Sequence, residues 1–422
     1  MAEAQAVKQI MTTADGTPLK VSLNRALRRN KIRAFLWVVP LLLFITVTFI
    51  IPIADMMFRS VENSIIGEVL HRTGAALNSW DETTGELPGE EVYAALFADM
   101  EEGQENKTLG RVGTRLNYEE PGMASVFRSS PRKFRSIEGP PYKEEIIAAN
   151  KAWGDVNTWR VIKRQSSKYT PTYFLAALDF KMNYEGDIVR QDEDRQIYLK
   201  LFVRTMWLSA LITVLCLLLG YPISYLLATL PSKTSNLLLI LVLLPFWTSL
   251  LVRTSAWIAL LQQEGVINDL LVWIGFIADD GRIRMIHNQI GTVVAMTHIL
   301  MPFMVLPLYS VMKTIPPSYM RAALSMGANP VLAFRKVYLP QTLPGIGAGG
   351  ILVFIIAIGY YITPALVGGT SGTLISNFIA YHMSTSLNWG LAAALGVILL
   401  GLVLALYILY DKVVGIDNMK LG

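Results

Sequence analysis

Long apolar stretches separated by short polar segments make up most of the chain outside one charged region in its first half. A helix needs about 20 predominantly apolar residues to cross the hydrocarbon core of a bilayer. Six stretches reach that length, at residues 34–58, 205–230, 236–261, 290–312, 345–367 and 389–410. The pattern therefore predicts an all-α integral membrane protein with six transmembrane helices.

The same pattern divides the chain into four parts. A basic segment, 1–33, precedes the first transmembrane helix, 34–58. An insert domain, defined as residues 59–200, follows it and is long enough to bury a core of its own. The membrane core, 201–422, holds transmembrane helices two to six.

The insert domain is expected to be mixed in structure. Its part 101–141 is rich in glycine, proline, arginine and glutamate with weak apolar periodicity, which predicts irregular or extended chain. Helices are expected at 143–153, 169–178 and 192–201. Two interpretations of its role stay open: it docks an external partner, or it only rigidifies the outer surface.

Composition agrees with the membrane class. Hydrophobic residues make up 53% of the chain and charged residues 16%, against roughly 25% in soluble domains. Cys216 is the single cysteine and falls inside the second span, so no disulfide framework exists. The net charge of +5 is accounted for by basic loops, and we expect no nucleic-acid partner.

The basic loops set the expected orientation. Lysine and arginine in short loops mark the cytoplasmic side of a membrane protein. They gather before the first span, after the second, between the fourth and fifth, and after the sixth. Both termini are therefore predicted to be cytoplasmic, and the insert domain external. Segment 20–33 is compatible with an amphipathic helix on the inner leaflet or with a flexible tail.

A polar hinge segment, 313–344, lies between the fourth and fifth spans and carries ordered helix signals. Ser318 is a good N-cap, and Gly327 sits where a left-handed residue ends a helix. Ala322 and Ala323, with Gly327, predict a face of little side-chain bulk. Such a face lets another surface approach closely.

A second short helix is expected to follow directly. Asn329 is its N-cap, and Pro330 falls at the first helical position, where the missing N–H costs nothing. The helix is expected to run to Leu339 and to end at Pro340. Two short helices joined by a tight turn, placed between membrane spans, indicate a segment that grips another protein.

Several kinds of chemistry have no signature in the sequence. No Gly-x-x-x-x-Gly-Lys-Ser/Thr phosphate loop occurs. The four histidines and one cysteine have no metal-ligand spacing, and no Ser, His and Asp set stands out. We therefore expect no enzyme activity, no metal and no cofactor bound by this chain.

The hinge segment resembles the coupling motif of permeases of binding-protein-dependent ATP-binding-cassette (ABC) importers. That motif reads Glu-Ala-Ala-x-x-x-Gly and ends in hydrophobic-Leu-Pro. The matching residues are Ala322, Ala323, Gly327, Leu339 and Pro340, with a second proline at Pro344. Arg321 occupies the family's glutamate position, so an acidic or carbonyl partner is expected for it.

A second stretch resembles the spermidine/putrescine-type branch of that family. It reads Pro-Phe-Trp-Thr-Ser at 245–249, Val-Arg-Thr at 252–254 and Ala-Trp at 256–257, followed by Gly265 and Asn268. The resemblance covers about 199–412 and the first span. Most of the insert domain is additional to the compact form of the family, so the resemblance says little about it.

The resemblance implies a type I ABC importer permease in a bacterial inner membrane, forming the path for a polyamine such as spermidine or putrescine. ATP and Mg would sit on a partner ABC ATPase dimer. The other implied partners are a second permease subunit, expected to be a different chain, an extracytoplasmic substrate-binding protein, and membrane lipid. The residues implied to couple to the ATPase are Arg321, Ala322, Ala323, Gly327, Asn329, Pro330, Leu339 and Pro340.

Two other functions stay open. Because the spans offer almost no acidic side chains, the solute could be another amine-bearing compound, such as an opine, an aminophosphonate or an amino-acid-like molecule. A stand-alone secondary carrier is the other alternative, although no internal repeat of the kind typical of such carriers is evident.

Candidate residues of the translocation path come from the third and fifth spans. Tyr360, Tyr361 and Thr363 lie where the fifth helix could open, and aromatic faces can hold ammonium groups. The third span adds Trp247, Thr248 and Arg253, of which Arg253 interrupts an uncharged run. An ionisable residue inside a membrane is a functional candidate by default. Ordinary packing, or snorkelling of Arg253 to the interface, is the alternative for this set.

Overall fold

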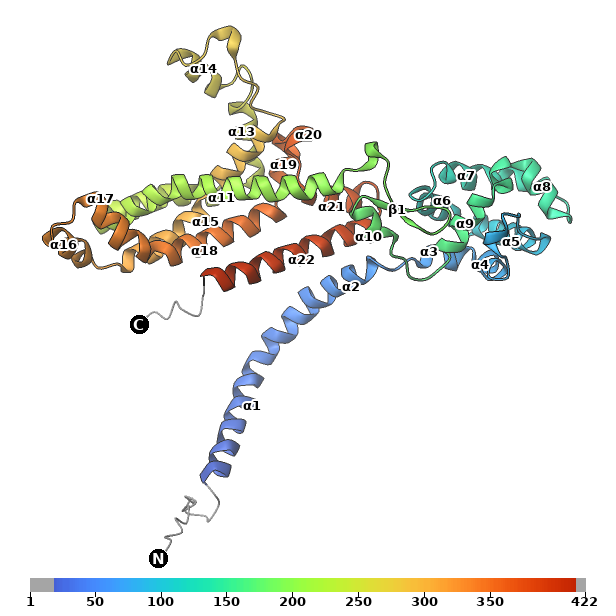
Figure 1. Ribbon diagram of the computed structural model, residues 1–422, viewed down its shortest axis with the longest axis horizontal. Coiled ribbons are helices and arrows are strands. Elements are labelled where there is room, and N and C mark those ends of the chain that lie inside the picture. Colours follow the sequence, from blue (N-terminus) through green and yellow to red (C-terminus); the bar gives the residue numbers. More distant parts are fainter. Residues whose placement is uncertain (1–18, 415–422) are drawn as a thin grey trace, which may run out of the picture. The chain divides into compact units, whose positions relative to one another are not determined.

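The computed structural model describes residues 19–414, and nearly all of its ordered elements are helices (Figure 1). The chain divides into two compact units, 1–58 and 59–422. Within the described residues, five helices are long and apolar enough to cross a bilayer, and one bent pair makes a sixth span. The prediction of an all-α membrane protein with six spans is confirmed.

The first unit is a single apolar helix. It comprises α1 (Leu19–Ile45), a π-helical turn η1 (Thr46–Ile50) and α2 (Ile51–Arg59). Because α1 starts at Leu19, segment 20–33 continues the first span as a helix. Trp37 is 86% exposed within the chain, which means that lipid or another protein must cover this apolar surface in the membrane.

The insert domain is built almost entirely of short helices. They are α3 (Ser64–Val69), α4 (His71–Leu77), α5 (Glu90–Glu105), α6 (Leu109–Asn117), α7 (Met123–Phe134), α8 (Tyr142–Ala149), α9 (Val156–Gln165) and α10 (Thr172–Ala177). The antiparallel strands β1 (Phe180–Met182) and β2 (Ile188–Arg190) form a hairpin before the second span. The helices expected at 143–153 and 169–178 correspond to α8 and α10.

The expectation of irregular chain at 101–141 is wrong. This part contains the end of α5 and all of α6 and α7. In α6, Leu109, Val112 and Leu116 are buried, which places them on one helix face. The glycine, proline and charged residues lie between these positions and conceal an amphipathic pattern. The region expected to be helical at 192–201 holds only a 3₁₀ turn, Glu193–Arg195, before the second span begins.

Three aromatic side chains form the centre of the insert domain. Tyr93, Trp153 and Trp159 are fully buried, with ring centroids 4.8 to 5.5 Å apart. The Tyr93 hydroxyl donates to the Trp153 carbonyl at 2.8 Å, and Trp153 Nε1 donates to Ser130 Oγ at 2.9 Å. These hydrogen bonds satisfy the Tyr93 hydroxyl and the Trp153 indole at the centre of the hydrophobic core.

The membrane core is a bundle of long helices with short ones at its ends. Its elements are α11 (Tyr198–Thr229), α12 (Ser232–Leu243), η5 (Leu244–Trp247), α13 (Leu250–Leu260), α14 (Val266–Trp273), α15 (Gln289–Thr314), α16 (Pro317–Ser325), α17 (Pro330–Ala333), η7 (Phe334–Tyr338), α18 (Leu339–Gly359), α19 (Ile362–Val367), α20 (Gly369–Gly372), α21 (Ile375–Ser384) and α22 (Trp389–Val414). Helices α11, α15 and α18 pack together at its centre (Figure 1). A Cβ atom at Gly349 would lie 3.1 Å from the Met304 carbonyl oxygen, a tighter contact than side chains usually make, so glycine favours the close approach of α18 to α15.

Two spans differ from the predicted ones. The third bends by 96° between α12–η5 and α13, at Thr248–Ser249, where one straight helix was expected at 236–261. The fifth runs from Pro330 to Gly359. It was expected at 345–367, but the chain leaves the helix at Tyr360. Both differences place a break in backbone that was expected to be one straight helix.

Candidate coupling segment and pathway

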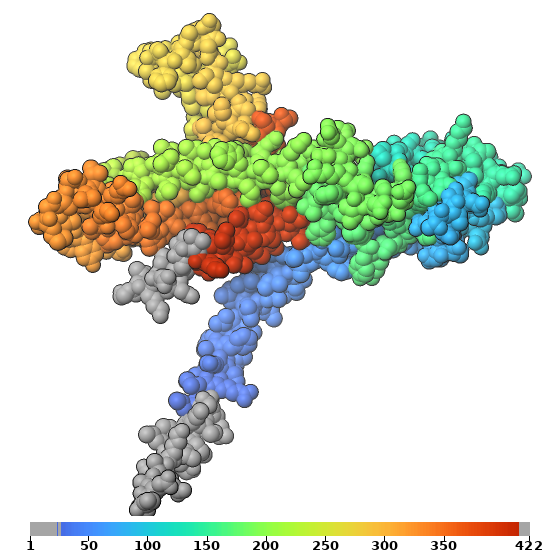
Figure 2. All heavy atoms as spheres, in the orientation of Figure 1, coloured from blue at the N-terminus to red at the C-terminus, as the bar shows by residue number. Residues whose placement is uncertain are grey.

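The hinge segment forms an exposed end of the second unit, at the opposite end of α11 from the insert domain (orange in Figure 2). Its first helix, α16, starts at Pro317, whose fixed φ suits the first helical position. The N-cap is therefore Pro316, and the expectation that Ser318 caps the helix is wrong by two residues.

The turn after α16 follows the predicted chemistry. Gly327 has φ of +89°, a left-handed conformation that glycine adopts without strain. The Ala328 amide donates to the Ala323 carbonyl and the Gly327 amide to the Leu324 carbonyl. This is the Schellman arrangement, which satisfies the last carbonyl groups of a helix.

The next helix begins as expected but does not end as expected. Asn329 Oδ1 accepts from the Leu332 amide at 2.7 Å, with Pro330 at the first helical position. The chain then passes through the π-helical turn η7 into α18, and the Leu339 amide donates to the Phe334 carbonyl five residues earlier. This wider turn stands directly before Pro340, which takes the second position of α18 instead of ending the helix. The hinge segment is thus directly continuous with the fifth span.

The exposed face of the hinge segment is more apolar than the sequence suggested. Arg321, Ala322, Gly327, Asn329, Pro330 and Pro340 are exposed, and Leu339 is half-buried. Ala323 is buried within the chain, so the expectation that it lies on a face open to a partner is wrong. Large apolar side chains surround the exposed positions: Tyr319, Leu324, Met326, Val331 and Leu332, with Met326 82% and Val331 75% exposed. Several exposed apolar side chains on one short segment are typical of a protein interface.

Aromatic side chains hold the hinge segment against the second span. Phe334 stacks on Tyr338, and Tyr225 of α11 makes edge contacts with both. The Tyr221 hydroxyl lies 3.1 Å from Thr342 Oγ1. Because the hinge segment is packed on α11 and continuous with α18, a displacement of this segment would move both helices. A loose loop would absorb such a displacement.

The candidate path residues come together only in part. Arg253 directly precedes Thr254 on α13, and Tyr360 stands at the break between α18 and α19. Thr363 of α19 is buried, with its Oγ1 3.3 Å from Thr254 Oγ1. The structure therefore brings Arg253, Tyr360 and Thr363 to one region beside the break between α18 and α19.

The remaining candidates lie apart from this region or face outward. Trp247 is 72% exposed, and the Thr248 hydroxyl donates to the Pro245 carbonyl at the bend of the third span. Tyr361 is 47% exposed, and its carbonyl accepts from Asn377 Nδ2. In the isolated chain these residues line an outer surface.

The sequence reading missed two members of the Arg253 region. Trp257 Nε1 donates to His298 Nδ1 at 3.2 Å, joining α13 to α15. Trp257 follows Arg253 by one turn of α13, so His298 lies beside the same face of that helix. His298 is an ionisable residue inside the fourth span, which is the signal that would have identified it.

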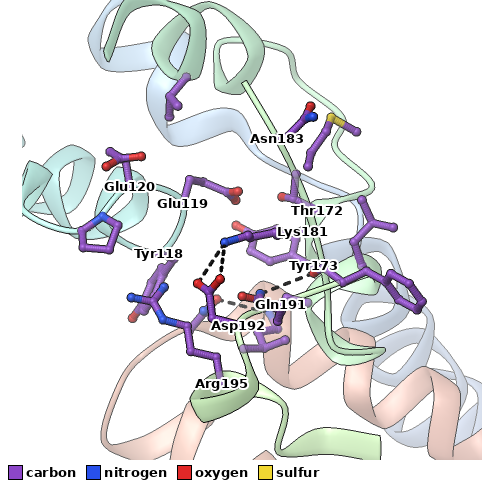
Figure 3. A pocket seen from close by; sticks show the side chains of 18 of the residues that line it. Tyr118, Glu119, Glu120, Thr172, Tyr173, Lys181, Asn183, Gln191, Asp192 and Arg195 are labelled. Atoms are coloured by element: carbon purple, nitrogen blue, oxygen red, sulfur yellow. Dashed lines mark hydrogen bonds and ion pairs between the residues drawn. The ribbon is translucent and has the colours of Figure 1, made fainter. Parts of the chain in front are cut away.

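A polar cavity of about 590 Å³ lies where the insert domain meets the membrane core (Figure 3). Lys181 Nζ is 2.9 Å from Asp192, and this pairing lowers the pKa of the Asp192 carboxyl. The Tyr184 hydroxyl donates to Glu120 Oε2 at 2.6 Å, which raises the pKa of Tyr184 to about 12. Most charged groups of the cavity already have partners, so the cavity favours neither a cationic nor an anionic ligand.

Comparison with known proteins identifies the membrane core. Residues 203–414 match the family described as "Binding-protein-dependent transport system inner membrane component". Over 214 residues the chain is 35% identical to the spermidine/putrescine transport system permease protein PotB of Escherichia coli K12, covering 50% of this chain and 77% of that protein. It is 30% identical to the inner membrane ABC transporter permease protein YdcU of the same organism, covering 51% of this chain and 71% of that protein.

A solved structure also aligns with the chain. It is a crystal structure of a bacterial ABC transporter involved in the import of alginate, with 19% identity and a TM-score of 0.41 over 55% of this chain and 81% of that one. The family match covers half of the chain and contains both the hinge segment and the Arg253 region. The chain therefore belongs to the inner-membrane permease family of binding-protein-dependent ABC importers.

Proposed function

We propose that this chain is the permease subunit of an ATP-driven importer for a polyamine such as putrescine or spermidine. The observation that carries the proposal is the 35% identity to polyamine permeases across the membrane core. The hinge segment supports the coupling role, because its capped helices present an exposed apolar patch.

The proposed assembly contains this chain, a second permease chain, an ATPase dimer and a binding protein. Two permease chains form the path, an ATPase dimer binds ATP and Mg, and a binding protein delivers the solute from outside. Both termini and the hinge segment face the cytoplasm, where Arg321, Arg335 and Lys336 are exposed to meet acidic or carbonyl groups of the ATPase. The insert domain faces outward as a platform for the binding protein.

A second solute class has an observation in its favour. Residues 196–263 and 281–410 contain no aspartate or glutamate, whereas a cationic solute favours carboxylates along its route. An amino-acid-like solute, which carries both an amine and a carboxylate, would suit Arg253 better.

Reconstitution in proteoliposomes tests the proposal. The chain would be combined with its ATPase, second permease and binding protein, and uptake of labelled putrescine and spermidine measured with and without ATP. ATP-dependent accumulation of either diamine or triamine supports the proposal. Accumulation of neither, in vesicles that hydrolyse ATP in response to the binding protein, contradicts the solute assignment.

The Gly327→Asp variant tests the coupling role in the same vesicles. A charged side chain on the exposed turn should reduce ATP-driven uptake by more than about tenfold, since it places an unpaired carboxylate in a desolvated interface. Gly85→Asp is the matched control, because Gly85 also has a left-handed φ, of +71°, and open space around it. Equal uptake by the two variants would remove the hinge segment from the coupling mechanism.

A further inference from the structure

Arg253 is a half-buried cation without a complete set of partners. Its Nε and Nη1 atoms are shielded from solvent, and neither has a hydrogen-bond partner within the described part of the chain. Burying a charged group without compensation is strongly unfavourable, and more so inside a membrane. In the working protein these two nitrogens must therefore meet an acceptor that residues 19–414 do not supply here.

The neighbouring groups determine which charge that acceptor should carry. His298 accepts a hydrogen bond at Nδ1 from Trp257, so the proton of the neutral imidazole is on Nε2, which makes that atom a donor. Thr254 and Thr363 are within hydrogen-bond distance of each other. The region thus offers a guanidinium and an imidazole N–H, a set suited to an anionic oxygen.

Helix breaks on two sides make the region accessible from outside the chain. The third span bends at Thr248–Ser249, five residues before Arg253, and the fifth breaks at Tyr360. Non-helical backbone at membrane depth is tolerated where it lines a cavity or is covered by protein. These breaks therefore indicate that a second surface or a solute reaches Arg253.

We propose that Arg253 and His298 form a receptor for a carboxylate that arrives from outside this chain in the assembled importer. The inference rests on the proposed function, because that assembly provides two sources: an acidic side chain of the second permease, or the carboxylate of a transported solute. A guanidinium binds a carboxylate through two parallel N–H bonds, and either of the two unpartnered nitrogens can form such a pair together with Nη2.

Structure determination of the complete wild-type transporter tests the proposal without any substitution. Cryo-electron microscopy would be applied to the assembly without solute, with putrescine, and with ornithine, which is putrescine bearing a carboxylate. A carboxylate of the second permease within 4 Å of Arg253 in all three states, or the ornithine carboxylate at that place in the third state, supports the proposal and names the source. Lipid, water or a carboxylate of this same chain at Arg253 in all three states overturns it.

Uptake by variants adds a functional arm. Arg253→Gln should lower the uptake of putrescine or of ornithine, depending on the source of the carboxylate, by at least about tenfold. The reason is that removing one member of a buried ion pair is strongly destabilising. Arg253→Lys should recover part of the loss, because lysine keeps the charge but not the two-bond geometry. Arg204→Gln is the control, because Arg204 Nη1 already donates to the Thr370 carbonyl at an exposed position.

The two sources and the proposed function separate in this assay. With the second permease as source, Arg253→Gln loses putrescine uptake, and neutralising the partner carboxylate restores it. With the solute as source, only ornithine uptake falls. If Arg253→Gln takes up both solutes as well as the wild type does, the inference is overturned, while putrescine uptake by the wild type still supports the proposed function. If a carboxylate occupies Arg253 but the wild type takes up no diamine, the inference is supported and the proposed function is contradicted.

Discussion

Two arginines show how differently a guanidinium group is satisfied in the insert domain and in the membrane core. Arg115 in the insert domain donates to Asn63 at 2.9 Å and to Gln165 at 2.8 Å, pairs with Glu119 at 2.8 Å, and lies over the Tyr173 ring. Arg253 in the membrane core has two buried nitrogens without partners. All three guanidinium nitrogens of Arg115 therefore have partners among the described residues of the chain, whereas two of those of Arg253 do not.

Tryptophan placement repeats the same contrast. Trp153 and Trp159 are fully buried in the insert domain, whereas Trp207 and Trp247 in the membrane core are 63% and 72% exposed. Burial of apolar surface from water stabilises the first region. The second needs lipid and partner subunits to cover its surface, which is what an importer subunit that works in an assembly requires.

The largest expected effect is on the stability of the insert domain. Trp153→Ala should destabilise that domain by about 3–5 kcal/mol, because it empties the centre of a packed core. Trp207→Ala, the same substitution at an exposed site, should leave it unchanged. Urea-dependent proteolysis of the insert domain in the full chain measures both; similar losses in the two variants would remove the contrast between the regions.

A smaller effect is expected from overpacking the membrane core. Gly349→Leu would force α18 away from Met304 of α15, at a cost of about 1–3 kcal/mol. The adjacent Gly350→Leu is the control, because a Cβ there meets nothing within 4 Å. Thermal unfolding of the purified chain in detergent should show a lower midpoint for Gly349→Leu alone; matching midpoints would mean that close helix approach does not stabilise this bundle.

The hinge segment should respond to loss of its helix cap. Asn329→Ala removes the acceptor for the Leu332 amide and should destabilise α17 locally by about 1 kcal/mol. Asn329→Ser keeps a capping oxygen and should behave like the wild type. Hydrogen exchange at the start of α17 reports the difference; unchanged exchange in Asn329→Ala would show that packing alone holds this helix.

The smallest effect concerns the cavity beside the insert domain. The Glu120 carboxylate raises the pKa of Tyr184 to about 12, so the neutral phenol is favoured in the folded state. The stabilisation from this contact is present below the ordinary tyrosine pKa of about 10 and is lost as pH rises through 12. Glu120→Gln should move the Tyr184 titration, followed by tyrosinate absorbance, toward lower pH. An unmoved titration would exclude this hydrogen bond as the cause.

Some local signals of the hinge segment were interpreted correctly from the sequence, and others, such as the N-cap expected at Ser318, were not. Gly327 and Asn329 act through their own backbone neighbours, so their roles at the turn could be predicted. Pro340 was misjudged because the π-helical turn before it accommodates a proline that would otherwise end a helix. The α6 helix was missed because glycine and arginine separate its buried positions.

The Arg253 region shows the same limit at the candidate site. The charge of Arg253 stood out within an apolar span, but its neighbour His298 lies on another helix. No spacing in the sequence relates the two, since their proximity is created by the packing of α13 on α15. The lack of partners for Arg253 Nε and Nη1 among the described residues depends on the positions of the surrounding side chains, which no sequence pattern specifies.

Site-directed cross-linking tests the central claim, that the hinge segment docks on a separate ATPase, most directly. In a Cys216→Ala background, a cysteine would replace Met326, which is 82% exposed, and the control cysteine would replace Leu387, which is 65% exposed outside the hinge segment. We expect the Met326→Cys chain to cross-link to the ATPase subunit in membranes, with a yield that changes on ATP addition, and the Leu387→Cys chain not to. A purified, active transporter in which Met326→Cys never cross-links to the ATPase would contradict the account.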